Sequence, residues 1–219
     1  MIPGITDVRR LPRLGKIRLG EKLKSKSGSD YPSKTDHFIF KDVPEVAELY
    51  GENCKALDIL LPHENTDIFF PQGLRSYGKS RGLFCRSDDG VTATRVRLGI
   101  SDGEHSRIPK GQPLDPQGEA YIKEAGIDVA VGEMYDLACP HHDCPFFEKK
   151  LCRGVGRLLF MLPKVPRFGV YEISTTSYNG MVEVNSMIEA IRNVAGRVSM
   201  IPLTLRLVPK QVTVDGKAT

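Results

Sequence analysis

Three of the five cysteines in this 219-residue chain lie within fourteen residues, in the stretch CPHHDCPFFEKKLC that runs from Cys139 through Cys144 to Cys152. Prolines and charged residues interrupt the stretch too often for a buried helix or strand. A structural zinc ion takes four nitrogen or sulfur ligands, and tight turns must hold the thiolates about 2.3 Å from the metal. A Cys-Pro pair begins such a turn at both Cys139 and Cys144. The spacing therefore predicts a metal-bound loop around which the rest of the chain is organised.

The fourth ligand must lie outside this stretch or be a histidine within it. Cys85 ends an apolar run directly before the turn sequence at residues 87–90, where its thiol can face a neighbouring loop. His141 and His142 are the alternatives, because either would complete a site of three cysteines and one histidine. Cys54 lies beside the start of an apolar strand and is expected to be an inert, partly buried thiol. The expected zinc ligands are Cys85, Cys139, Cys144 and Cys152.

We expect this site to be closed and structural. A catalytic zinc needs an open coordination position and a nearby base. Asp143 and Glu148 are candidates for that base, but solvated loop charges explain both more simply. Four cysteines can instead hold an iron–sulfur cluster. Cysteines that only pack are the third possibility, and the His, Asp and Pro residues around Cys139 and Cys144 argue against it.

Basic residues are concentrated near the N-terminus. The net charge of +4 divides into +5 over residues 1–30 and −1 over the remainder. The region ends in Gly, Ser and Lys residues, which predicts a linker-like basic arm over residues 1–35. Such an arm can neutralise phosphates or contact an acidic protein surface, and a solvated terminus is the plain alternative. The expected binding residues are Arg9, Arg10, Arg13, Lys16 and Arg18 in the arm, with Lys164 and Arg167 at the tip of a predicted hairpin.

Residues 36–219 are expected to form one zinc-containing α+β domain, mainly of antiparallel strands. Short apolar runs predict strands over residues 38–40, 56–61, 66–70, 82–85, 91–98, 157–162, 168–174 and 200–208. We expect these strands to form an OB-like barrel. Residues 99–155, which begin with a polar segment of no clear period, are expected to form an inserted metal-loop subdomain.

Two segments carry helix signals. Residues 42–51 begin with Asp42 as a cap, have Pro44 in the first turn and end at Gly51. The second helix begins at Ser177 or Asn179, ends at Gly196, and is amphipathic. The apolar residues expected to pack its one face on the sheet are Val184, Met187, Ile188, Ile191, Val194 and Ala195.

The composition excludes several classes of protein. No apolar run approaches the ~20 residues that cross a bilayer, and no signal-peptide pattern follows the N-terminal arginines. In a reducing compartment, clustered cysteines are more often metal ligands than disulfides. We therefore expect a cytoplasmic protein without membrane contact.

The rest of the sequence predicts no catalytic site. It contains no phosphate-binding Gly-rich loop and no Gly-x-Ser-x-Gly elbow. Asp88 and Asp89 can bind a cation, although such a pair usually sits in a turn between strands. Aromatic residues form only 7% of the chain and tryptophan is absent, so stacking on nucleic-acid bases is weakly indicated.

Short pieces spread over almost the whole chain match, in order, a known family. They are 11–21, 31–32, 36–38, 50–51, 56–62, 75–78, Cys85 with 89–90, the three clustered cysteines, 169–171, 176–177 and 212–217. On these pieces the sequence resembles the phage recombination directionality factor-like family, whose members are often labelled metal-binding proteins. The family pattern groups Cys85 with Cys139, Cys144 and Cys152 and does not depend on Cys54.

The resemblance implies a small accessory factor in the cytoplasm of a bacterial host cell. Such a factor would bind a large serine integrase, together with its DNA, and switch it from integration to excision without catalysing a reaction itself. A zinc-containing single-stranded DNA-binding protein is the second hypothesis. A metal-dependent hydrolase or nuclease using Asp88, Asp89 or Glu148 is the third.

Overall fold

The computed structural model describes residues 11–24, 30–78, 82–98, 115–208, 213–214 and 217–218. These residues belong to two compact units. The terminal unit consists of Met1–Phe70, Arg157–Thr175 and Met181–Thr219, and the cysteine unit of Pro71–Gly156 and Thr176–Gly180. Each unit has its own apolar core.

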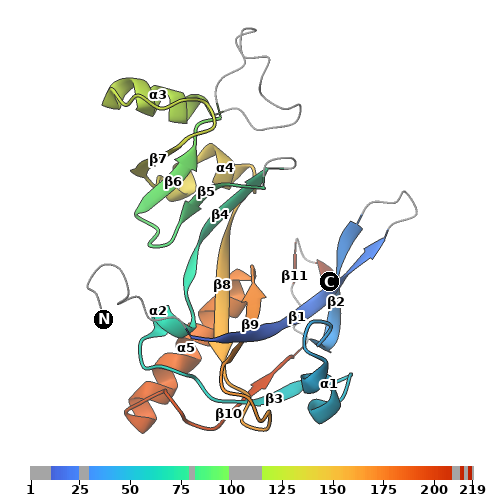
Figure 1. The fold of residues 1–219 in the computed structure, drawn as a ribbon. Helices are drawn as coiled ribbons and strands as arrows, with labels where there is room; N and C mark the ends of the chain where they lie inside the picture. The colour runs from blue at the N-terminus through green and yellow to red at the C-terminus, as the bar shows by residue number, and fades with distance from the viewer. Residues whose placement is uncertain are drawn as a thin grey trace. The chain divides into compact units, whose positions relative to one another are not determined.

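Eight strands are hydrogen-bonded in the order β2-β1-β9-β8-β4-β5-β6-β7 (Figure 1). Their bounds are Arg13–Lys24 (β1), Asp30–Ile39 (β2), Gln72–Gly78 (β4), Gly82–Ser87 (β5), Thr92–Val96 (β6), Met134–Ala138 (β7), Cys152–Phe160 (β8) and Val170–Thr175 (β9). Among these strands β2 and β7 are the two ends of the order, so the described sheet is open. The α+β class and the mainly antiparallel pairing are as predicted. The OB-like barrel is not confirmed, since the two end strands do not pair.

The terminal unit adds a small sheet and three helices to its strands. These elements are α1 (Pro44–Tyr50), β3 (Ala56–Ile59), α2 (Thr66–Phe69), α5 (Tyr178–Ala195, of which the first three residues belong to the cysteine unit) and β10 (Leu203–Arg206), followed by the short strands β11 (Thr213–Val214) and β12 (Lys217–Ala218). Strand β10 pairs with β3 in antiparallel register. The core between these elements is rich in aromatic and branched side chains, including Phe38, Phe69 and Phe160.

Helix α1 forms where the sequence predicts it, but the predicted side-chain cap at Asp42 is absent. Pro44 occupies the first turn, and the backbone N–H of Gly51, at φ +83°, donates to Ala47. Asp42 does not cap the helix. Its carboxylate instead accepts from Arg18 at 2.7 Å, because an arginine on the neighbouring β1 competes for the same oxygen.

The strand predicted over residues 66–70 is wrong, because this segment forms α2. Asn65 precedes it with an extended backbone, and its side-chain oxygen accepts from the N–H of Asp67 at 2.8 Å. This cap stabilises the first turn of a helix. Phe69 and Phe70 are still buried, so the apolar run identified the core but not the element.

The amphipathic helix α5 also forms as predicted. The Ser177 hydroxyl accepts from the N–H of Gly180 at 3.2 Å, and Gly196 ends the helix with φ +70°. Of the expected apolar face, Ile188 is buried, whereas Met187 is 61% exposed and Val194 90% exposed. The packed stripe is therefore narrower than predicted.

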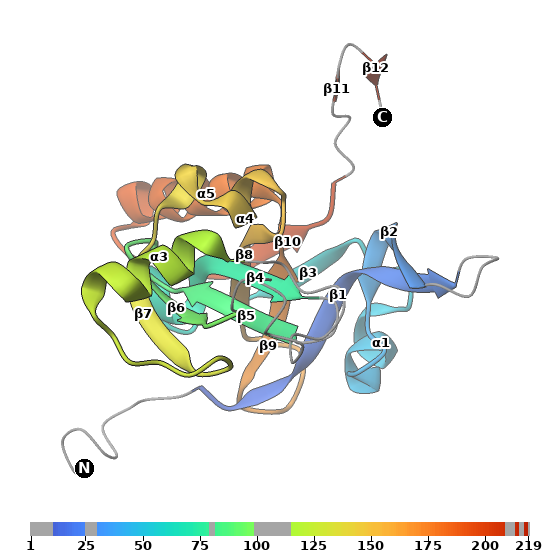
Figure 2. The same ribbon diagram turned by 90° about the horizontal axis from the view of Figure 1, so that it is seen from above.

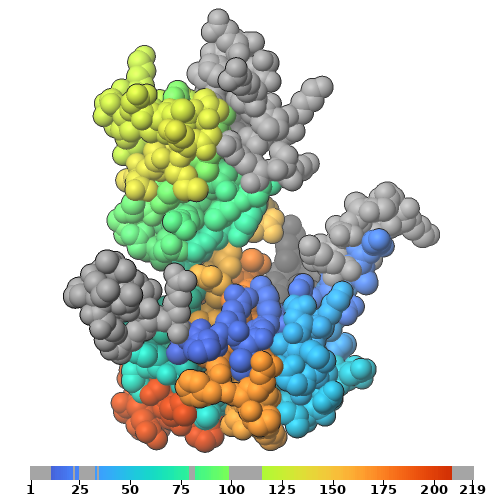
Figure 3. All heavy atoms as spheres, in the orientation of Figure 1, coloured from blue at the N-terminus to red at the C-terminus, as the bar shows by residue number. Residues whose placement is uncertain are grey.

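The expected basic arm over residues 1–35 includes two strands of the terminal unit. Strand β1 pairs with β2 in antiparallel register and with β9 in parallel register. Ile17 in β1 is fully buried. In the space-filling view, the atoms of β1 (dark blue) lie against the light-blue atoms of β2 and α1 (Figure 3). Residues 13–24 and 30–35 of the predicted arm therefore form strands of the terminal unit.

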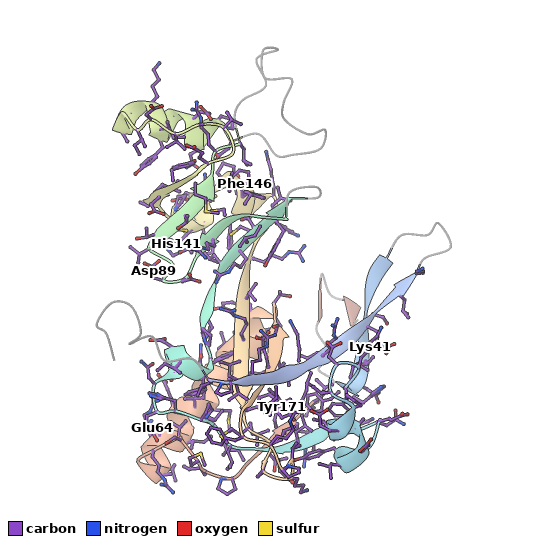
Figure 4. All side chains as sticks on the ribbon, in the orientation of Figure 1. Lys41, Glu64, Asp89, His141, Phe146 and Tyr171 are labelled. Carbon is purple, nitrogen blue, oxygen red and sulfur yellow. The ribbon has the colours of Figure 1, made fainter. Side chains whose placement is uncertain are left out.

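Glu64 fixes the segment that follows α5. Its carboxylate accepts from the backbone N–H groups of Val198 and Ser199 at 3.0 and 2.9 Å, and also from the Ser199 hydroxyl. Figure 4 labels Glu64 in the terminal unit. These bonds, chiefly those from Ser199, lower the pKa of Glu64 to about 2.

We expect Glu64→Gln to lower the thermal stability of the protein in a pH-dependent manner. A carboxylate whose pKa is depressed on folding stabilises the folded state above its unfolded pKa, about 4.5, and loses that contribution as the pH falls towards 2. The melting temperatures of wild type and variant should differ at pH 7 and converge by pH 2, measured by circular dichroism. Glu48→Gln, at an exposed position of α1, is the control. If the difference in melting temperature stayed constant between pH 7 and pH 2, the ionised carboxylate of Glu64 would not be the source of the stabilisation.

The cysteine unit is built on β4, β5, β6, β7 and the first part of β8, which lie side by side (Figure 2). It also contains α3 (Pro116–Ala125), the 3-10 turn η1 (His141–Asp143) and α4 (Pro145–Glu148). Helix α3 was not predicted, although Asp115-Pro116 and Gly126 are ordinary start and stop signals. Residues 99–114 lie outside the described part of the chain. No described helix is long and apolar enough to cross a membrane.

Candidate metal centre

The strand register places two of the expected zinc ligands on one face of the sheet. Ser76 on β4 pairs directly with Cys85 on β5 and with Cys152 on β8. The same row continues across β6 and β7 to Arg95 and Tyr135. Residues opposite each other on paired strands point to the same side. Both cysteines therefore flank Ser76, whose side chain is 1% exposed.

The other two expected ligands come from the segment that covers this face. Cys139 directly follows β7, and its N–H donates to Val91 at 2.7 Å. Cys144 precedes α4, and its N–H donates to His141 at 3.1 Å. Cys144 is 6% exposed, and Cys139 packs against the same core. The folded chain thus gathers the four cysteines in the core of the cysteine unit.

The four thiols are close enough to interact electrostatically. Cys85 interacts with Cys144 and Cys152, and Cys152 also interacts with Cys139 and Cys144. Burial raises the pKa of the Cys85 thiol, an effect that Arg95 opposes, and it raises the pKa of the Cys152 thiol, which Ser76 opposes. All five cysteines of the chain are free thiols. Within the described ranges no three His, Cys, Asp or Glu side chains are arranged to hold a metal ion.

A buried arginine lies beside these thiols. Arg95 is 1% exposed, and its Nη1 donates to both carboxylate oxygens of Asp115 at 3.0 and 3.2 Å. Its Nη2 lies 3.6 Å from the Cys144 sulfur, and its guanidinium carbon lies 5.0 Å from the ring centre of Phe146. Although burial opposes the charged form, the carboxylate of Asp115 and the nearby thiols raise the pKa of Arg95.

One donor of Arg95 has no partner. Its Nε is buried and makes no hydrogen bond to any described residue. An unsatisfied donor of this kind costs about 1–3 kcal/mol, and more when the group is charged. Negatively charged sulfurs would be suitable acceptors. Soft sulfur ligands select zinc over hard cations, so the four cysteines fit zinc by donor type, although no three of them stand in a metal-holding arrangement among the described residues.

The two histidines face other groups. The ring of His142 packs edge-on against Phe147, with ring centres 4.7 Å apart. His141 lies against the turn at Gly90, where an added Cβ would come within 3.3 Å of its Cε1. Figure 4 shows His141 beside Asp89, with Phe146 on a different part of the unit. Both histidines are exposed.

Cys54 lies in the other unit and does not join the cluster. It is partly buried against the core of the terminal unit, and its thiol donates to the carbonyl of Ala56 at 2.9 Å. This arrangement agrees with the expectation of an inert thiol.

The basic residues expected to bind DNA or a partner are engaged with acidic groups where the structure describes them. Arg13 and Lys16 lie 3.0 and 3.4 Å from the buried carboxylate of Glu172. Arg18 pairs with Asp42, as noted above. Arg9 and Arg10 lie outside the described residues. Arg13, Lys16 and Arg18 therefore form ion pairs within the terminal unit.

The expected hairpin tip is likewise paired. Lys164 lies 2.6 Å from Asp58 and 5.2 Å from the ring centre of Tyr50. Arg167 lies 3.4 Å from Glu45, which also accepts from the hydroxyl of Tyr171. The sequence located these cations correctly at a turn but gave no sign of their carboxylate partners, which lie more than a hundred residues away in the chain.

Comparison with known proteins gives one result. The family model described as Gp3-like, recombination directionality factor-like, matches residues 14–219. The match spans all four clustered cysteines and residues of both units. No curated protein and no solved structure gives a significant match.

Proposed function

This chain belongs to the recombination directionality factor-like family, and we propose that it binds a large serine integrase and switches it from integration to excision. The family match over residues 14–219 is the observation that carries this proposal. The chain would act as an accessory factor in the bacterial cytoplasm and would catalyse no reaction.

Such a switch requires different affinities for two states of the integrase. A factor that binds both states equally shifts nothing. Moving the integrase from 1:99 to 99:1 in favour of the excision state requires about 10⁴-fold tighter binding to that state. The surfaces of a folded chain can provide this difference without an active site.

Two of the three acidic residues considered for a nuclease, Asp88 and Asp89, have structural roles that support a non-catalytic function. Asp89 accepts the N–H groups of Val91 and Thr92, both at 2.8 Å, and these bonds lower its pKa. Asp88 forms an ion pair with Arg75. Both carboxylates thus hold the turn between β5 and β6, as expected for this pair.

We propose a structural zinc ion held by Cys85, Cys139, Cys144 and Cys152. The common core of the four thiols, the pairing of Cys85 and Cys152 with the same Ser76 and the unsatisfied Nε of Arg95 support this ligand set. The exposure of His141 and His142 favours Cys85 as the fourth ligand. Zinc bound there would cross-link β5, β8 and the segment before α4, and so contribute folding free energy. An iron–sulfur cluster is the alternative, and metal analysis of the purified protein distinguishes the two.

The proposed function is tested by recombination with the cognate integrase and purified DNA sites. We expect the protein to stimulate recombination between the two hybrid sites produced by integration and to inhibit recombination between the original pair. It should also co-elute with the integrase when DNA is absent. Excision that is unaffected by the protein, together with no co-elution, would refute the proposal.

A further inference from the structure

A row of arginines crosses the outer face of the sheet in the cysteine unit. Arg75 on β4 pairs directly with Arg86 on β5 and with Arg153 on β8. These positions neighbour Ser76, Cys85 and Cys152 in sequence, and side chains alternate between the two faces of a strand. The arginine row, Arg75, Arg86 and Arg153, therefore points away from the cysteine-containing core.

Three like charges in direct cross-strand positions destabilise a sheet. Directly opposite Cβ atoms lie only about 4.5–5.5 Å apart. One arginine of the row is compensated, since Arg75 pairs with Asp88 and donates to the Ser87 carbonyl at 3.0 Å. Arg153 is exposed, and its one hydrogen bond to a described residue is to the Lys150 carbonyl, at 3.2 Å. Arg86 is exposed, and its side chain has no hydrogen bond or ion pair to another described residue.

The positions that continue the row across the sheet are polar. Lys149 and Lys150 are exposed in the segment before β8, as is Leu151. Thr94 continues the row on β6, and Asp136 ends it on β7. A stable protein–protein interface usually has an apolar, well-packed centre with few charges. A centre made of arginines fits a polyanion better.

We propose that the arginine row binds the sugar–phosphate backbone of duplex DNA. Guanidinium groups donate in pairs to phosphate oxygens, and each contact displaces condensed counterions. Such contacts are independent of base sequence. A single strand is less suitable, because its binding uses aromatic side chains on which successive bases stack. In the described part of β4, β5 and the first half of β8, the one exposed aromatic residue is Tyr77, at 57%.

This inference goes beyond the proposed role, because it concerns the protein and DNA without any integrase. Its test is fluorescence anisotropy with labelled duplexes of unrelated sequence, at a series of salt concentrations. The double variant Arg86→Ser/Arg153→Ser removes the two exposed members and keeps Arg75, which holds the turn. We expect its affinity to fall about tenfold or more on all duplexes. The slope of log K against log salt should become shallower by about 2.

Two further variants distinguish an effect of the arginine row on DNA affinity from an effect of net charge or of misfolding. Lys41→Ser/Arg197→Ser removes the same charge at exposed positions of the terminal unit and should leave the slope within about 0.5 of wild type. Arg86→Lys/Arg153→Lys should retain most of the slope, since lysine also neutralises phosphate. The lysine variant and the control should melt near the wild-type temperature, and Arg86→Ser/Arg153→Ser should melt at that temperature or above it, because the repulsion between like charges is removed.

Several outcomes would overturn the inference. The inference is wrong if the wild-type protein does not bind duplex DNA at low salt. It is also wrong if the arginine variant and the control variant lose the same amount of DNA affinity. Tighter binding to a single strand than to a duplex would assign the row to that ligand instead. If the arginine variant bound DNA normally but no longer co-eluted with the integrase, the row would be a contact for an acidic protein surface.

Discussion

Cys144→Ser is expected to lose zinc and to unfold the cysteine unit. Structural zinc in small domains contributes on the order of 10 kcal/mol of apparent binding free energy, which appears as folding free energy. Removal of one of four ligands should therefore cost at least about 3 kcal/mol. Without a metal, the change from thiol to hydroxyl at this buried position should cost only about 1–2 kcal/mol.

Metal content and local protection measure this effect together. Elemental analysis should give one zinc per wild-type chain and substantially less in the variant. Hydrogen exchange should show loss of protection in β5, β6 and β7, with the terminal unit less affected. Cys54→Ser is the matched control, because Cys54 lies in the terminal unit and should change neither metal content nor exchange in the cysteine unit.

Chelation gives an independent check of the same site. A strong chelator should lower the melting temperature of the wild type and leave Cys144→Ser little changed. A Cys144→Ser protein that keeps its zinc, or a wild type that contains no metal yet keeps full stability, would rule out a closed four-cysteine site.

Asp115→Ala is the second variant for which we expect a large loss of stability. Asp115 is the carboxylate partner of Arg95 and, with its side chain 4% exposed, is as buried as that arginine. It also accepts from the N–H of Gly118 at 2.9 Å and so caps α3. Removing one member of a buried ion pair leaves an uncompensated charge, which typically costs about 3–5 kcal/mol.

A matched pair of variants isolates the buried charge as the cause. Asp88→Asn alters an ion pair of the same unit whose carboxylate is mostly exposed, so it should cost less than about 1 kcal/mol. Arg95→Met/Asp115→Ala should be less destabilised than Asp115→Ala alone, because the unpaired cation is gone. The free energies of unfolding come from denaturant titrations. If Asp115→Ala were no more destabilised than Asp88→Asn, the ion pair would not be a major stabilising contact.

The local sequence was sufficient to predict an element where the signal for its ends lay within a few residues. Ser177 and Gly196 define α5, and the polar sequence at 87–90 defines a turn, because caps and turns depend on neighbouring backbone groups. The order of motifs along the chain indicated the family, and the match over residues 14–219 confirms it. The local signal was misleading at Thr66–Phe69, where the cap at Asn65 favours a helix in an apolar run that predicted a strand.

The tertiary structure alone decided which strands are neighbours. The pairing of β1 with β9 joins segments about 150 residues apart, and it makes a strand of residues that read locally as a basic arm. Likewise, only the register across β5, β4 and β8 places Cys85 and Cys152 on one face and three arginines on the other. Strand pairing depends on the burial of whole faces and on long-range contacts. The sequence by itself therefore determined where the clustered cysteines, the cations and the ends of α5 lie, and the fold decided which side chains meet.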